Sequence, residues 1–397
     1  QQVVGYENRQ WELHQYWPST HRSEIDNSRK GHAHLAFSKT ENLTSEGYFS
    51  YVKDFKGGHN LNATAGYSYF EVNGENFGMD NYNFSVDGIK YWDIGQGSYL
   101  TDGKAGMSSG KSVTERLFSF FARANYSYQD KYMLSASIRH EGSSKFAADN
   151  RWANFWSATA GWRISNEEFM KDFDWLDDLK IRFGYGVTGN NDFSATYMAN
   201  MLGSDTNWMM PNGTWAYSYG KSQNVNPNLG WEEKKEWNLG VDYSFFEGRL
   251  YGKFDYYRRE VDNLLFSVKV PQPPYTQGSQ MQNIGSMESK GWEFEVGGDI
   301  IRTKDFTWSS SMNLSHNTGK ILTLEGDNSY HNGNGFVAPG TPGDAARMEA
   351  GSTIGSFYMW KFAGFDDEGS FLLYNKDGEV IPAAQKTEND KQYIGNY

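Results

Sequence analysis

The stretch Leu117–Tyr128, which reads LFSFFARANYSY, decides the fold of this chain. Its residues alternate between two faces, and an alternation of period two is that of a β-strand. One face carries Phe118, Phe120, Ala122, Ala124, Tyr126 and Tyr128, and the other carries Ser119, Phe121, Arg123, Asn125 and Ser127. A strand with one apolar and one mostly polar face predicts a sheet that separates an apolar medium from water.

The same alternation returns along the chain at residues 132–138, 156–164, 237–245, 292–300 and 306–314. The predicted strands are about 9–14 residues long, which is enough for a tilted strand to cross a bilayer. Strands of soluble proteins are shorter, about five or six residues. We expect about eleven strands on clear signals and a few more on weaker ones, in an all-β, antiparallel transmembrane barrel.

The connections between the strands alternate in length. Short turns are predicted at residues 56–58, 129–130, 247–248 and 303–305, and long polar loops at residues 71–116, 141–153, 188–231, 261–290 and 317–350. Outer-membrane barrels have this asymmetry, with short periplasmic turns and long extracellular loops. Helical periodicity is confined to residues 166–178, where Phe169, Phe173 and Leu176 predict one helical turn.

Composition narrows the class of protein. Aromatic residues make up 17% of the chain although its mean hydropathy is −0.74, and no run of about 20 apolar residues predicts a membrane helix. The absence of Cys excludes thiol catalysis and disulfide bonds. A net charge of −12 argues against a nucleic-acid partner. Two classes remain, a membrane barrel with aromatic girdles and a soluble β-rich protein that acts on glycans.

Two short patterns suggest a cofactor or a metal. Gly184, Gly186 and Gly189 match a dinucleotide-binding G-x-G-x-x-G pattern, but the residues that follow predict a loop and not the helix that such a site needs. His32 and His34 share a face of a predicted strand, yet no third ligand is near them in sequence. We therefore read the glycines as part of a strand and the histidines as polar strand residues.

Two acidic patterns suggest calcium binding or glycoside hydrolysis. The segments Asp366–Gly369 and Asn375–Gly378 lack the ligand spacing of a calcium loop and predict tight turns around a hairpin at residues 370–374. Glu293 and Glu295 lie about 7 Å apart on one strand face, which in a barrel is the water-filled lumen. We expect no catalytic residue, no cofactor and no bound metal. The candidate ligand-binding residues are the rings of a predicted extracellular loop, Trp208, Trp215, Tyr217 and Tyr219.

A sheet of about eleven strands has two free edges, and an open sheet cannot span a bilayer because every backbone donor and acceptor there needs a partner. We therefore expect residues 1–397 to form part of a barrel domain, with a plug domain and the last strands outside this sequence. No signal peptide is visible at the first residues, which fits a missing N-terminal part.

Several segments from residue 117 onward resemble the SusC/RagA-type TonB-dependent outer-membrane transporters. They are DKYMLSASIRHEGSSKF (130–146), GWRISNEEF (161–169), LKIR (179–182), GVTGN (186–190), NPNLGWE (226–232), WNLG (237–240), NIGS (283–286), KGWE (290–293) and GSTIGSFY (351–358). His140 and Glu141 depart mildly from the usual Arg/His-Asp pair, and residues 1–116 resemble the family only in style.

The resemblance implies a 22-stranded barrel of the plugged-lumen kind, of which this chain holds a part. It implies TonB-dependent import of an oligosaccharide or oligopeptide across the bacterial outer membrane. The implied partners are a SusD-like surface lipoprotein, TonB through the missing plug segment, and outer-membrane lipid, in a dimer of transporter–lipoprotein pairs. The alternatives are a passive porin or adhesin barrel and a soluble glycan-active protein.

Overall fold

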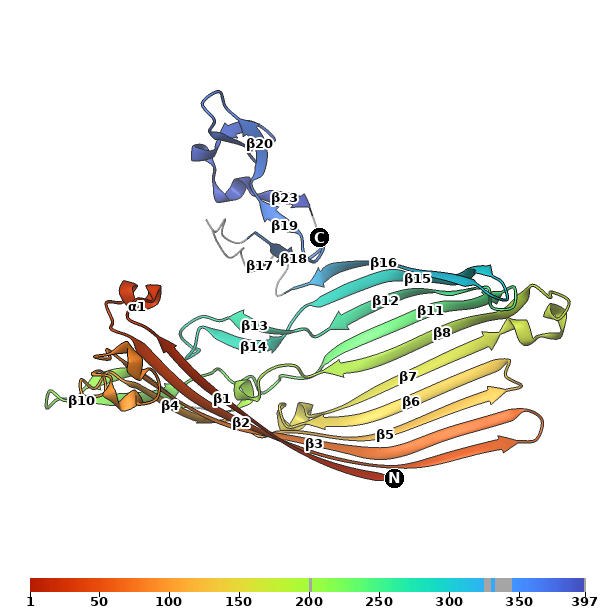
Figure 1. The fold of residues 1–397 in the computed structure, drawn as a ribbon, viewed down its shortest axis with the longest axis horizontal. Helices are drawn as coiled ribbons and strands as arrows, with labels where there is room; N and C mark the ends of the chain where they lie inside the picture. Colours follow the sequence, from red (N-terminus) through yellow and green to blue (C-terminus); the bar gives the residue numbers. More distant parts are fainter. Residues whose placement is uncertain (200–201, 325–329, 333–344, 396–397) are drawn as a thin grey trace.

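A large antiparallel sheet dominates the computed structural model, which describes residues 1–199, 202–324, 330–332 and 345–395 (Figure 1). Eleven strands follow one another in chain order along the sheet, and β4 (Gly106–Lys111) pairs with β3 off this path. The eleven are β1 (Gln2–Trp17), β2 (His32–Phe55), β3 (His59–Tyr82), β5 (Glu115–Tyr128), β6 (Tyr132–Ser143), β7 (Trp152–Arg163), β8 (Leu176–Asn190), β11 (Glu232–Phe245), β12 (Leu250–Asp262), β15 (Ser286–Arg302) and β16 (Thr307–Thr323). The eleven clearly signalled strands and their antiparallel order are confirmed, and β4 is one strand beyond them in this sheet.

Several strands are longer than the sequence pattern predicted. β2 and β3 each have 24 residues. The expected loop at 71–116 is wrong in part, because β3 continues to Tyr82 and β4 lies inside the expected loop. The expected loop at 317–350 likewise begins too early, since β16 continues to Thr323. In the upper part of β3, the face that is apolar lower down carries Glu71, Asn73 and Glu75, so the alternation that reveals a half-apolar strand disappears.

Short turns connect neighbouring strands at one end of the sheet, at the right of Figure 1, as predicted. Between β5 and β6, Gln129 and Asp130 have φ of 51° and 52°, the left-handed conformation of a tight hairpin turn. Residues 164–175 link β7 to β8 at this end through two 3-10 turns, η4 (Ile164–Asn166) and η5 (Glu168–Met170), in place of the predicted helical turn at 166–178.

A cluster around Glu167 fixes this longer turn. Its carboxylate accepts hydrogen bonds from Tyr132 Oη at 2.6 Å, Lys131 Nζ at 3.0 Å and Trp162 Nε1 at 3.1 Å. These bonds, with that of Tyr132 the largest contribution, lower the pKa of Glu167 to about 2. Two rings at the ends of β6 and β7 are therefore anchored to a single charged group.

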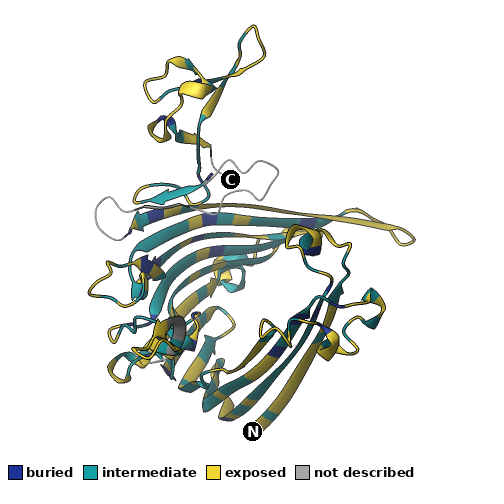
Figure 2. Cartoon of the chain, turned by 90° about the vertical axis from the view of Figure 1, so that its left-hand side faces the viewer, coloured by how far each residue is buried: buried dark blue, intermediate teal, exposed yellow. Residues whose placement is uncertain are grey.

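The large sheet has one apolar and one polar face. Large side chains on the apolar face are unusually exposed, for example Phe49 at 87% and Leu134 at 55%. Because the ladder pairs residues of the same face, the apolar rows run without interruption from strand to strand. Figure 2 shows the sheet curving into an open trough, the shape of part of a barrel wall.

Aromatic rings lie over glycines of adjacent strands on the wall. A Cβ added to Gly291 would come within 2.7 Å of the Tyr257 hydroxyl oxygen, and one added to Gly297 within 2.8 Å of the Tyr251 ring. The missing side chains leave room for a ring to lie flat on the neighbouring strand, an arrangement that fixes strand register.

The remaining secondary structure lies beyond the other end of the sheet or after β16. It includes a short α-helix, α1 (Arg22–Asp26). The small sheets are β9–β10 (Leu202–Met209, Trp215–Lys221), β13–β14 (Leu265–Lys269, Ser279–Asn283), β17–β18 (Tyr330–Asn332, Arg347–Glu349), β19–β23 (Phe357–Met359, Gln392–Gly395) and β20–β21–β22 (Lys361–Phe365, Phe371–Tyr374, Val380–Pro382). The 3-10 turns are η1 (Asp87–Ile89), η2 (Ile94–Gln96), η3 (Ala148–Asn150), η6 (Ala195–Met198), η7 (Ala383–Gln385) and η8 (Glu388–Asp390). None of the helices in the described ranges has the length and apolarity needed to span a membrane.

The segment after β18 hydrogen-bonds to the outer edge of β16. Ile321 N donates to Ser352 O, Gly351 N donates to Ile321 O, and Ile354 N donates to Gly319 O, each at 2.9 Å. Residues 351–354 therefore cover the edge of β16 at residues 319–321 and do not extend towards its turn end at Thr307.

Candidate functional site

The predicted ligand-binding rings lie on the β9–β10 hairpin, at the loop end of the sheet. Trp208 pairs with Ala216 in the ladder, whereas Trp215 pairs with Met209. Since paired residues share a face and successive residues alternate, Trp208 and Trp215 lie on opposite faces of the hairpin. Tyr217 pairs with Asn207, and Tyr219 lies at a break in the register between Ser218 and Gly220.

These rings are accessible to a ligand. Trp208 is 68% exposed, Trp215 66% and Tyr219 69%. Exposed rings of this size are unusual on a soluble surface, and aromatic side chains are common anchors for bound ligands. The hairpin therefore offers two separate aromatic surfaces and does not gather all four predicted residues into one site.

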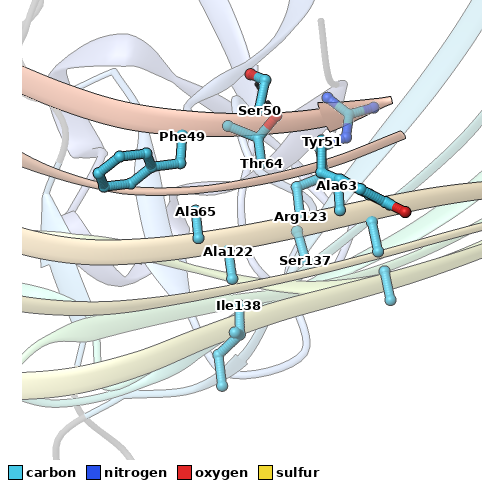
Figure 3. A pocket seen from close by; sticks show the side chains of 12 residues that line it. Phe49, Ser50, Tyr51, Ala63, Thr64, Ala65, Ala122, Arg123, Ser137 and Ile138 are labelled. Carbon is cyan, nitrogen blue, oxygen red and sulfur yellow. Dashed lines mark hydrogen bonds between the residues drawn. The ribbon is translucent and has the colours of Figure 1, made fainter. Parts of the chain in front are cut away.

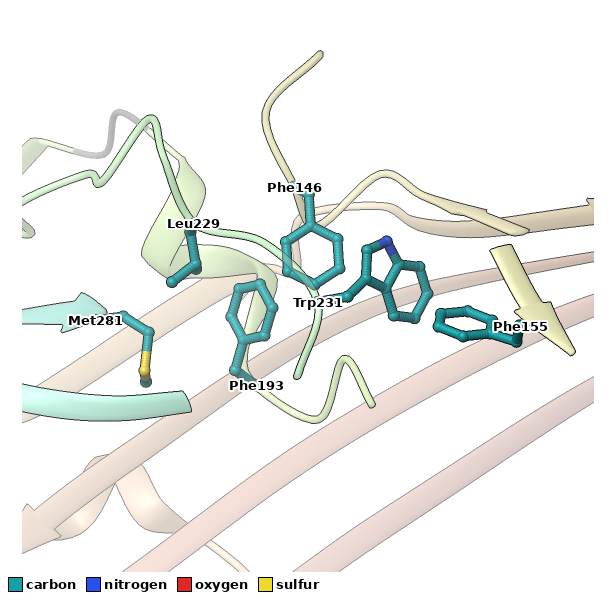
Figure 4. Packing of buried hydrophobic residues seen from close by; sticks show 6 residues of the cluster. All are labelled: Phe146, Phe155, Phe193, Leu229, Trp231 and Met281. Atoms are coloured by element: carbon teal, nitrogen blue, oxygen red, sulfur yellow. The ribbon is translucent and has the colours of Figure 1, made fainter. Parts of the chain in front are cut away.

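A buried cluster, here called the loop core, holds the neighbouring loops together (Figure 4). It consists of Phe146, Phe155, Phe193, Leu229, Trp231 and Met281. The Trp231 ring centroid lies 5.0 Å from that of Phe146 and 5.3 Å from that of Phe155, and its Nε1 donates to the carbonyl oxygen of Arg151 at 3.0 Å. Three connections and two strands thus meet in one packed unit.

Asparagine side chains fix the β13–β14 hairpin to the segment that precedes β11. Asn224 Nδ2 donates to the carbonyl oxygens of Gln277 and Ser279 at 2.7 and 2.8 Å. Asn283 accepts from the Gly230 backbone N at 2.7 Å and donates to its carbonyl oxygen at 2.9 Å. These amides take the place of strand pairing, so the loops form a defined rim. Sequence reasoning missed both the loop core and these amides.

Charged side chains form a ladder across the polar face of β8, β11, β12 and β15. Arg182 donates to Asp242 at 2.8 and 2.9 Å and to Asp255 at 3.2 Å. Lys253 pairs with Glu295 at 3.0 Å. Glu295, one of the two carboxylates considered for glycoside hydrolysis, is therefore part of an ion-pair ladder, as a polar wall requires.

The paired histidines lie at the start of β2 on the polar face. His32 Nε2 and His34 Nδ1 each lie 2.8 Å from the same oxygen, Oδ1 of Asp80. The His32 ring stacks between Trp17 and Tyr82, with centroids at 4.5 and 4.2 Å. Over the ranges that the structure describes, no group of three or more His, Cys, Asp or Glu side chains is arranged to hold a metal ion.

The glycine pattern and the two turn patterns have structural explanations. All of Gly184–Gly189 lies within β8. A Cβ at Gly189 would lie 2.0 Å from Phe155 Cζ, so this glycine makes room for the loop core. In the predicted turns, Asp366 Oδ1 accepts from the backbone N of residues 368 and 370, and Asn375 Oδ1 accepts from those of residues 377 and 379.

Comparison with known proteins identifies this architecture. Residues 2–395 match the family model described as TonB dependent receptor-like, beta-barrel. The chain belongs to this family. The apolar face of its sheet accordingly contacts the lipid of the bacterial outer membrane, the polar face lines the lumen, and the long loops are extracellular.

Named relatives and solved structures agree with this assignment. The chain is 35% identical over 291 residues to the TonB-dependent receptor SusC of Bacteroides thetaiotaomicron, a match that covers 70% of this chain and 29% of the relative. It is 31% identical over 408 residues to the TonB-dependent receptor P39 of Formosa agariphila, covering 99% and 36%. The structure of the RagAB peptide transporter superposes with a TM-score of 0.78 at 25% identity, covering 99% of this chain and 42% of that one. The chain thus spans about a third of the length of these curated relatives.

Proposed function

We propose that this chain forms part of the wall of an importer that takes up an oligosaccharide or oligopeptide nutrient across the outer membrane. Residues 1–397 supply part of the barrel domain, and the whole protein adds a plug domain whose TonB-contacting segment couples import to the inner membrane. A SusD-like surface lipoprotein works at the extracellular rim, in a dimer of transporter–lipoprotein pairs. The observation that carries the proposal is the family match along the whole described sheet.

The geometry of the rim supports a role in ligand capture. The loop core and the asparagine contacts give the extracellular loops a fixed shape, and a fixed shape lowers the entropic cost of binding. The exposed rings of Trp208 and Trp215 project from this frame. A ring can stack on a sugar face or pack against a peptide side chain, so they suit both substrate classes.

Uptake by the full-length protein in its native host tests the proposal. Labelled nutrient should enter the wild-type strain and should not enter a strain without TonB. Persistent uptake without TonB would refute energised import and favour a passive barrel. With the full-length protein and its nutrient, W208A/W215A should weaken binding by about tenfold or more, since exposed Trp anchors typically contribute 2 kcal/mol or more. W92A, which removes a Trp that is 77% exposed on another loop, is the matched control.

A further inference from the structure

A groove crosses the apolar face of the wall over strands β3, β5, β6 and β7. Figure 3 shows the part of this groove that is lined by β2, β3, β5 and β6. Its floor contains Ala63, Ala124, Ala136 and Ala158, which are consecutive partners across the ladder. The row ends at a tyrosine on either side, because Tyr51 pairs with Ala63 and Tyr185 pairs with Ala158. The groove contains two adjoining cavities of about 490 and 460 Å³ that share Ala124 and Ala136.

Large side chains raise the wall above and below this floor. On β5 the floor includes Ala122 beside Ala124, and the large rings of this face lie beyond them, with Phe120 towards the extracellular end and Tyr126 towards the turn end. On β6 the floor residue Ala136 lies between Ile138, 52% exposed, and Leu134, 55% exposed. The alanine floor is therefore lower than the larger rings and aliphatic side chains of the same face that lie towards the two ends of the strands.

The medium around this face restricts the occupant. In hydrocarbon a polar peptide or a water molecule in the groove would lose its hydrogen-bond partners, whereas a flexible hydrocarbon chain follows a floor of methyl groups. With strands about 4.7–4.9 Å apart, the row from Tyr51 to Tyr185 is about 24 Å long, a length suited to an extended chain. The groove is also continuous with the lipid-contacting surface on both sides.

We propose that this groove binds one acyl chain of a bilayer phospholipid, laid across the four strands. A chain in the groove contacts the alanine floor and both rims, so it makes more van der Waals contacts than a chain against a flat wall. Such a chain exchanges more slowly than its neighbours and remains bound when bulk lipid is removed. This inference concerns the lipid face alone and does not depend on which nutrient is imported.

Groove-filling substitutions in the full-length protein test the proposal. A124L/A136L fills the floor with side chains that suit lipid, so the barrel folds, which heat-modifiable migration verifies. Native mass spectrometry in detergent containing a trace of phosphatidylethanolamine measures the lipid bound per barrel. Retention should fall to the level of lipid bound elsewhere on the barrel, because the leucine side chains occupy the groove and remove its extra van der Waals contacts with the chain. V241L, which enlarges a side chain of the same face on β11, should retain lipid as the wild type does.

Two results would overturn the proposal. Equal lipid retention in the wild type and A124L/A136L would show that the groove holds no ordered chain. A loss of oligomeric state in A124L/A136L with lipid retention unchanged would show that the groove receives a second copy of the protein.

Discussion

Replacing Trp231 by Ala is expected to open the extracellular loop core while the barrel wall stays folded. Trp231 is 7% exposed and packs against Phe146 and Phe155. Removal of a buried Trp costs about 3–5 kcal/mol. The lost hydrogen bond to the carbonyl oxygen of Arg151 adds about 1 kcal/mol.

A total cost of about 4 kcal/mol or more corresponds to an increase in local opening of about 700-fold or more, at about 1.4 kcal/mol for each factor of ten. The wall is held by separate ladder hydrogen bonds and lipid contacts, so the opening is confined to the loops. Hydrogen exchange measured by mass spectrometry should show loss of protection at residues 144–151 and 190–198 in W231A. Strands β5 to β7 should keep their protection at mid-height.

The control is W208A, which removes an exposed Trp of the β9–β10 hairpin and should leave the loop core protected. The reasoning would be refuted if W231A exchanged like the wild type at residues 144–151, or if β5 to β7 lost protection equally. The first outcome would mean that the cluster does not hold the loops, and the second that loops and wall unfold as one unit.

Three further predictions address other contacts. The pKa of Glu167 is lowered to about 2, so the contribution of this carboxylate to stability is complete above the unfolded pKa of about 4.3 and is lost as pH falls towards 2. Thermal melts of E167Q should lack this acid-induced loss of stability, and melting temperatures of wild type and E167Q that fall in parallel from pH 5 to pH 2 would contradict the prediction. G189A should lower the free energy of unfolding by about 1–3 kcal/mol, because the added Cβ clashes with Phe155. The control G220A, with nothing within 4 Å of the added Cβ, should leave the denaturant midpoint unchanged. Equal denaturant midpoints for G189A and the wild type would reject the clash. Hydrogen bonds from Ser19 and Tyr16 lower the pKa of Asp87 and tie it to the β1–β2 loop. D87A should therefore release this loop at a cost of about 1.5–3 kcal/mol, measured as faster hydrogen exchange at residues 19–27. Unchanged exchange at these residues would show that Asp87 does not anchor the loop.

The wall was predictable because its signal is local. Each membrane-spanning stretch sets a ring or an aliphatic side chain on one face and a polar side chain on the other, as in Leu117–Tyr128, and the contrast between the two media preserves that pattern. Above the membrane both media are water. The upper part of β3 therefore lost the pattern, and the loop boundary predicted at residue 71 was wrong.

The loop architecture was not predictable for a different reason. The loop core joins residues up to 135 positions apart, from Phe146 to Met281, and no local pattern marks Phe193 or Met281 as buried. The same holds for Asn224 and Asn283, whose amides look like ordinary loop residues in sequence. The structure places Trp208 and Trp215 on the β9–β10 hairpin, and a hairpin register that sequence does not reveal puts them on opposite faces. That these rings bind ligand stays a prediction.

The hydrogen bonds between residues 351–354 and the edge of β16 limit how much of that edge is free to pair with another strand. Backbone groups at residues 319–321 are already bonded to residues 351–354, so a strand that continues the barrel beyond β16 can pair only with the part from Thr307 to Asn317. The free edge of β16 is therefore shorter than the ladder between β2 and β3, which pair from Phe55 up to His32. Within the described sheet, the paired wall at β2 and β3 therefore extends further from the turn end than the free edge of β16 does.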